Sequence, residues 1–145
     1  MIAIIAEKPS VGQEIARVVG ATEKKDGYIT GNGYMVTWAL GHLVSLALPG
    51  TYGYTRTTAE DLPMLPEPFR LVERQIRTDR GMVTDIAAGR QLKVIDGVFS
   101  ECDSIIVATD AGREGELIFR WIYSYLGCTK PFKRLWISSL TDEAI

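Results

Sequence analysis

The chain has 145 residues, of which 46% are hydrophobic and 23% are charged, and its formal net charge is −2. These values suit a single soluble domain with one core, and they exclude a strongly basic nucleic-acid-binding protein. A polyanionic partner would therefore be held by local charge or by metal ions on acidic residues. We expect no membrane span, because no apolar run approaches about 20 residues. We expect no signal peptide, because the N-terminus, MIAIIAEKPS, has no basic n-region and no cleavage site.

The first predicted unit is a strand followed by a helix. Residues 2–6, IAIIA, form an apolar run typical of a strand that is buried on both faces. Ser10 and Gln13 have the spacing of a capping box, and apolar residues at helical spacing continue to Val19, before Gly20 as a C-terminal cap. This order is typical of the first half of a βαβ unit.

The middle of the chain predicts a hairpin and then a long connection. Residues 27–40 form the hairpin around Gly31-Asn32-Gly33, which suits a tight turn. The proline-rich connection 49–68 is irregular, and the sequence leaves open whether it faces DNA or another domain. Residues 69–76 are then expected to form another strand.

The last third of the chain returns to alternating helices and strands. We expect a helix with Leu92, Ile95, Val98 and Phe99 on one face, a buried strand at 104–109, an amphipathic helix at 117–126 and a strand at 134–138. Thr141 looks like the N-cap of a helix that starts near the chain end. We therefore expect residues 1–145 to be a single domain, with the next domain of a longer protein cut off near 141–145.

The two cysteines, Cys102 and Cys128, have no metal-ligand spacing. We expect them to be reduced, half-buried thiols, because disulfides are rare in the cytosol. A cytoplasmic location follows as an expectation.

The charged residues gather where predicted strands end. The first strand runs into Glu7, and the strand at 104–109 runs into Asp110. The carboxyl ends of neighbouring parallel strands share one rim, and Glu114 can reach that rim from the following helix. Carboxylates crowded in this way are unfavourable unless a cation lies between them, and Mg²⁺ prefers such oxygen ligands.

Each of these residues also has a purely structural interpretation. Asp110 could cap a helix, Glu114 and Glu116 could be solvated first-turn charges, Lys8 could be a surface lysine, Arg113 a salt-bridge partner, His42 a core or hydrogen-bonding histidine, and Trp38, Trp121 and Trp136 core residues. The combination of a strand-end Glu-Lys pair with a strand-end acidic cluster favours a functional site.

Four segments carry a resemblance to a known family. IAEKPS at 5–10, ALGHL at 39–43, ATDAGREGELIFRW at 108–121 and KRLWISSLTDEAI at 133–145 resemble the N-terminal TOPRIM region of bacterial topoisomerase III, within the type IA DNA topoisomerases. The resemblance implies an α/β fold with a mostly parallel, Rossmann-like sheet, flanked by helices and carrying a hairpin and loop insertion. It also implies cleavage and resealing of single-stranded DNA through a 5′-phosphotyrosine.

The resemblance assigns roles to individual residues. Glu7 matches the glutamate that protonates the departing 3′ oxygen, and Lys8 matches the lysine on the scissile phosphate. Glu7, Asp110 and Glu114 match the acids that hold Mg²⁺. Arg113 matches the neighbouring catalytic arginine. Glu116 and His42 are supporting candidates, Glu116 through a metal-bound water or by binding the arginine.

Gly112 departs from the family pattern, because it stands where D-x-D-x-E has its second aspartate. The loss of one carboxylate predicts a single metal site, weaker than that of a full acidic cluster.

The nucleophilic tyrosine of the family lies in a later domain. None of the tyrosines here matches it, namely Tyr28, Tyr34, Tyr52, Tyr54, Tyr123 and Tyr125. The chain alone is therefore expected to be inactive, with single-stranded DNA and the remaining domains as its partners.

Two other functions remain open at this point. The same acids could serve a TOPRIM nuclease or primase, although the segment 133–145 resembles the join to the rest of a topoisomerase. The chain could also be a non-catalytic nucleic-acid-binding module, in which Glu7, Lys8, Asp110 and Glu114 would have no shared purpose.

Overall fold

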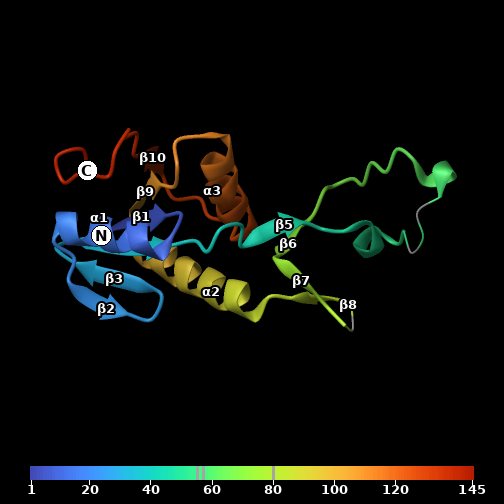
Figure 1. Cartoon of the computed structure of the whole chain (residues 1–145), viewed down its shortest axis with the longest axis horizontal. Coiled ribbons are helices and arrows are strands. Elements are labelled where there is room, and N and C mark those ends of the chain that lie inside the picture. Colours follow the sequence, from blue (N-terminus) through green and yellow to red (C-terminus); the bar gives the residue numbers. More distant parts are fainter. Residues whose placement is uncertain (55, 57, 80) are drawn as a thin grey trace.

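The computed structural model describes residues 1–54, 56, 58–79 and 81–145. A six-stranded sheet with strand order β10-β9-β1-β4-β3-β2 forms its centre (Figure 1). The parallel strands are β1 (Ile2–Ala6), β4 (Tyr34–Trp38), β9 (Ser104–Ala108) and β10 (Phe132–Arg134), and the antiparallel strands are β2 (Glu23–Lys25) and β3 (Tyr28–Gly31). The predicted α/β class with a mostly parallel sheet and a hairpin insertion is confirmed.

Helices cover both faces of the sheet. Helix α1 (Pro9–Val19) packs on one face, and α2 (Ile86–Glu101) and α3 (Arg113–Tyr125) pack on the other. Successive side chains of a strand point to opposite faces, so Ile4 joins the core under α1 and Ile5 the core under α2 and α3. The central strand β1 is therefore buried on both sides, as its continuous apolar run predicts.

The first helix starts differently from the prediction. Its N-cap is Lys8, which makes no side-chain capping bond, and Pro9 is its first residue. Proline suits this position because its missing N–H would be unsatisfied there anyway. The capping box of Ser10 and Gln13 is therefore wrong, whereas Gly20 ends the helix with a positive φ of 77°, as expected.

The single strand predicted at 69–76 is wrong in one respect, because it is split into two. Strand β6 (Leu71–Glu73) pairs with β5 (Val44–Leu46), and β7 (Gln75–Thr78) pairs with β8 (Gly81–Thr84). The break falls at Arg74, whose backbone N–H donates to the Leu43 carbonyl at 2.8 Å.

The chain end also differs from its prediction. The last strand lies at 132–134 rather than 134–138, and Trp136 beyond it is 77% exposed, so its assignment to the core is wrong. Residues 141–145 form a turn instead of a helix, in which the amides of Ala144 and Ile145 both donate to the Thr141 carbonyl.

An arm of residues 47–70 projects from the body, on the side away from both termini (Figure 1). It holds two short 3₁₀ helices, Pro49–Tyr52 and Ala59–Asp61, and corresponds to the proline-rich connection 49–68, of which residues 55 and 57 lie outside the described ranges.

In the part of the chain that is described, no helix has the length and apolar character needed to cross a membrane. Cys102 is buried, Cys128 is partly buried, and both are free thiols.

Candidate functional site

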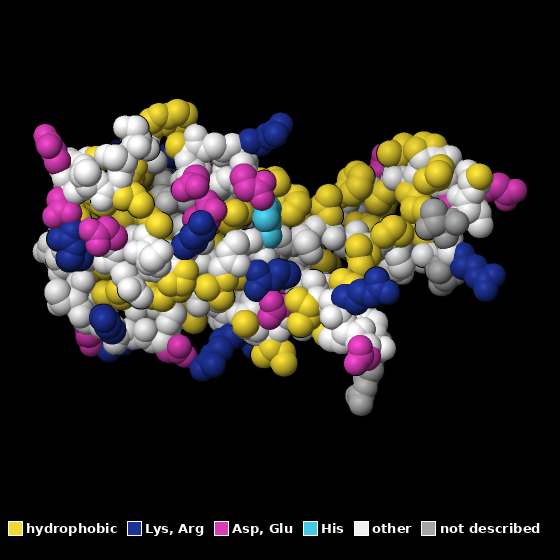
Figure 2. Space-filling view, in the orientation of Figure 1, with side chains coloured by type: hydrophobic (Ala, Val, Ile, Leu, Met, Phe, Trp, Pro, Cys, Tyr) yellow, Lys and Arg dark blue, Asp and Glu magenta, His cyan; other side chains and the backbone are white. Residues whose placement is uncertain are grey.

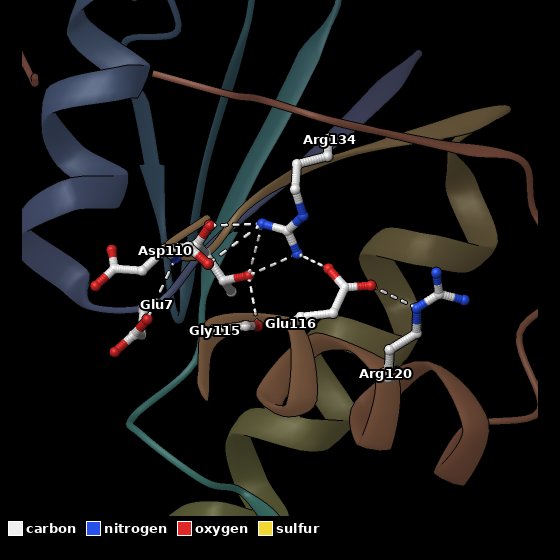
Figure 3. A network of polar contacts seen from close by, with 7 residues as sticks. Glu7, Asp110, Gly115, Glu116, Arg120 and Arg134 are labelled. Carbon is white, nitrogen blue, oxygen red and sulfur yellow. Dashed lines mark hydrogen bonds and ion pairs between the residues drawn. The ribbon is translucent and has the colours of Figure 1, made fainter. Parts of the chain in front are cut away.

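The strands that carry the two strand-end acids are neighbours. β1 and β9 pair in parallel with Ala6 opposite Ala108, so Glu7 and Asp110 follow at the same edge. The Asp110 backbone N–H donates to Glu7 Oε2 at 3.3 Å across 103 residues of sequence (Figure 3). The predicted shared edge is confirmed, and we call the carboxyl ends of β1 and β9 with these two acids the acidic rim.

The Asp110 side chain is free to bind a ligand. It is exposed, and no donor in the described part of the chain contacts its carboxylate. Helix α3 has its N-cap at Gly112, two residues further on, so Asp110 does not cap it. The capping interpretation of Asp110 is therefore wrong, and its carboxylate makes no hydrogen bond or ion pair with the described residues.

Glu114 points to a different partner. Its Oε1 lies 2.5 Å from Nε2 of His42, whose ring packs 5.5 Å from that of Trp121. Figure 2 shows the histidine against acidic side chains near the middle of this face. Within the described ranges, no three His, Cys, Asp or Glu side chains are grouped closely enough to hold one metal ion. Glu7 and Asp110 thus form a pair, with Glu114 apart from them.

The main chain at His42 is fixed by an arginine that the sequence did not single out. Arg74 donates to the carbonyls of Leu40 at 2.7 Å and His42 at 3.2 Å, and it pairs with Asp85 at 2.6 Å. Asp85 caps α2 by accepting from the Ala87 amide at 2.9 Å. The hydrogen bond from Arg74 lowers the pKa of Asp85 below its ordinary value.

Two exposed cations, Lys8 and Arg113, follow the ends of β1 and β9. Neither side chain makes a hydrogen bond or ion pair with any described residue. Arg113 is therefore not the salt-bridge partner of the structural interpretation. Lys8 precedes α1 and Arg113 opens α3, so both lie at helix N-termini, where backbone N–H groups and the helix dipole also favour anions.

Glu116 lies beside the rim but is occupied by arginines. It pairs with Arg120 at 2.7 Å and with Arg134, a residue that sequence reasoning missed (Figure 3). Its pKa is lowered below the ordinary value, first by the hydrogen bond from Arg120 and then by that from Arg134. The expected contact of Glu116 with Arg113 is not formed, because Arg120 and Arg134 hold its carboxylate.

The residues at the rim fit a hard cation such as Mg²⁺. Mg²⁺ is commonly held by one or two carboxylates, with water and substrate phosphate in the other positions. Glu7 and Asp110 supply such a pair. A groove of about 390 Å³ opens beside Asp110, between it and residues 135–140.

Comparison with known families matches residues 2–140 to the Toprim domain. The chain therefore belongs to the Toprim family. Among similar proteins are DNA topoisomerase 3 of Bacillus licheniformis and of Bacillus subtilis, each 47% identical over 146 residues, and that of Bacillus thuringiensis, 49% identical over 147 residues. Each match covers 98% of this chain but only 18–19% of the relative, so the chain spans about a fifth of their length.

Proposed function

We propose that this chain is the metal-binding part of a type IA DNA topoisomerase, which cleaves and reseals single-stranded DNA through a 5′-phosphotyrosine link. In the whole enzyme this cycle relaxes negative supercoils and decatenates DNA without ATP. The observation that carries the proposal is the contact of Asp110 with Glu7 across the paired ends of β1 and β9, beside the free Lys8. This arrangement suits a phosphodiester and a divalent cation together.

In this proposal Glu7 and Asp110 would hold Mg²⁺, and Glu114 would join them only by giving up its contact with His42. A bound Mg²⁺ neutralises phosphate oxygens and orients the DNA backbone. With Gly112 in place of a further aspartate, a single cation is expected. The contact between Glu7 and Asp110 supports these two as ligands, whereas Glu114 contacts His42.

The chain's own groups supply the rest of the chemistry. Glu7, when it is protonated and not bound to the cation, donates a proton to the 3′ oxygen that departs on cleavage and takes it back on resealing. Lys8 places its charge on the scissile phosphate, where it stabilises the charge that develops in the transition state. Arg113 contributes a second positive charge from the start of α3.

The chain alone binds metal but does not cleave DNA, because the nucleophilic tyrosine belongs to a later domain. Its partners are the remaining domains of the enzyme and, through them, single-stranded DNA. The enzyme acts in the cytoplasm, at the nucleoid. Relaxation of supercoiled plasmid by the isolated chain would contradict this assignment.

The test is a titration of the chain with Mn²⁺, followed by NMR line broadening, with Mg²⁺ as competitor. Mn²⁺ replaces Mg²⁺ at oxygen sites, and its unpaired electrons broaden signals nearby. Broadening centred on Glu7 and Asp110, reversed by Mg²⁺ and absent from Asp110→Asn, is the expected result. Broadening spread evenly over the acidic surface, or unchanged in Asp110→Asn, would refute the metal site.

A further inference from the structure

Arg134 reaches the acidic rim from the edge of the sheet. It is the last residue of β10, opposite Val107 of β9, and its side chain is only 18% exposed. The guanidinium therefore lies largely out of water, over the turn that joins β9 to α3 (Figure 3). A guanidinium in such a place is costly unless most of its donors are satisfied.

The donors of Arg134 are directed at that turn. Nη1 donates to the carbonyl oxygens of Thr109 at 2.7 Å and Asp110 at 3.5 Å, and Nη2 lies 3.4 Å from Thr109 Oγ1. Nη2 also pairs with Glu116, in the first turn of α3. One side chain thus ties the end of the strand to the start of the helix, on either side of Asp110.

The same turn is closed from inside by Gly115. Thr109 Oγ1 donates to the Gly115 carbonyl at 2.8 Å, and a β-carbon on Gly115 would lie 2.2 Å from the Asp110 carbonyl oxygen. The backbone of Asp110 is therefore held between Gly115 on one side and the guanidinium of Arg134 on the other.

We propose that Arg134 is a positioning residue for the acidic rim. By fixing the carbonyls of Thr109 and Asp110, it keeps the Asp110 amide on Glu7 and leaves the carboxylate free toward the groove. The effect of Arg134 on metal binding rests on the function proposed above, in which Asp110 and Glu7 bind the cation. Glu116 then serves to neutralise Arg134 instead of binding metal.

The fork of the guanidinium is essential to this role. Arginine presents five donors in a rigid plane, whereas lysine carries its donors on one nitrogen. A lysine at 134 would keep the charge and one contact, but it would not hold Thr109 and Glu116 together. Arg120 is the matched control, because it binds the other oxygen of Glu116, is more exposed, and makes no hydrogen bond to Thr109 or Asp110.

The experiment compares Arg134→Gln, Arg134→Lys and Arg120→Gln with the unchanged chain. NMR gives the amide signals of Glu7 and Asp110 without metal, and a Mg²⁺ titration gives the affinity. In Arg134→Gln we expect both amide signals to shift and the Mg²⁺ affinity to fall about tenfold or more, as for other groups that orient metal ligands. Arg134→Lys should give amide shifts and a loss of Mg²⁺ affinity intermediate between those of the unchanged chain and Arg134→Gln. Arg120→Gln should change neither the amide signals nor the Mg²⁺ affinity.

Unshifted Glu7 and Asp110 signals in a folded Arg134→Gln chain would overturn the proposal. Equal shifts in Arg120→Gln would also overturn it, because they would reflect a general effect of the Glu116 network. If Arg134→Gln does not fold, the Glu7 and Asp110 amide signals of Arg134→Lys, recorded without added metal, take its place: unshifted signals would overturn the proposal. If the unchanged chain binds no Mg²⁺, the proposed function fails, while the amide signals still decide the role of Arg134.

Discussion

Gly115 lies against Asp110 so closely that no other residue fits at position 115. A β-carbon there would meet the Asp110 backbone at 2.2 Å from the carbonyl oxygen and 2.7 Å from the nitrogen. The obstruction is backbone, which cannot rotate away as a side chain can. The glycine therefore allows α3 to start directly beneath the turn that carries the acid.

Replacing Gly115 with alanine should displace the turn and destabilise the fold. Forcing an extra carbon into a packed site costs about 1–3 kcal/mol, and we expect the free energy of unfolding in urea to fall by that amount. Mg²⁺ affinity should fall as well, because Asp110 moves. Gly97→Ala is the control: it lies in α2 with open space around it, and alanine there should stabilise by about 0.5–1 kcal/mol. Equal effects of the two substitutions would contradict the close approach.

Gly112→Asp should strengthen metal binding at the acidic rim. Gly112 has an extended backbone, and a β-carbon added there would meet nothing within 4 Å, so an aspartate is accommodated without strain. Because the residue is the N-cap of α3, the new side chain should also stabilise the helix by a few tenths of a kcal/mol. The control Gly112→Asn caps without charge. Calorimetric titration should show a higher Mg²⁺ affinity for Gly112→Asp and not for Gly112→Asn. The same affinity for the two variants would mean that residue 112 lies away from the metal.

Arg74→Met should be strongly destabilising. It leaves the carbonyls of Leu40 and His42 without their donor and removes the partner of Asp85, and losses of this kind cost about 1–3 kcal/mol. The matched control is Arg90→Met, which breaks a fully surface pair with Asp26 and should change stability by less than about 0.5 kcal/mol. Chemical denaturation of both variants makes the comparison. Similar values for the two would mean that Arg74 does not anchor the segment before β5.

Stability should decrease in acid. The pKa of Asp85 is lowered by its hydrogen bond from Arg74, and the pKa of Glu116 is lowered first by Arg120. A carboxyl group whose pKa is lower in the folded state stabilises the fold above its unfolded pKa, and this contribution is lost as the pH falls through the folded value. The free energy of unfolding should therefore drop as the pH falls below about 4. Urea titrations at several pH values test this, and Asp85→Asn should flatten the slope.

The central elements could be predicted because local patterns determine them. Strands 2–6 and 104–108 are apolar runs, and α3 has a strong apolar stripe at helical spacing. The shared edge of Glu7 and Asp110 followed from the rule for parallel strands. By contrast, β10 carries Lys133 and Arg134 and has little apolar character, so the sequence pattern favours the more apolar segment 134–138, which overlaps β10 only at Arg134.

The remainder of the site depends on contacts between residues far apart in sequence. Glu114 meets His42 across 72 residues, and Arg134 meets Thr109 across 25. No local spacing encodes such pairs, because they arise only after the sheet has brought the elements together. The two half-buried arginines, Arg74 and Arg134, cannot be told from surface arginines in the sequence.

The two acids of the rim come from adjacent strands that are far apart in the sequence, and this has a consequence for stability. Glu7 and Asp110 leave adjacent central strands, yet the chain between them includes the whole exposed arm. A cation shared by both would act as a reversible cross-link between β1 and β9, and at 100 times its Kd it would add about 2.7 kcal/mol to global stability. Amide hydrogen exchange of the central strands would then slow as cation is added.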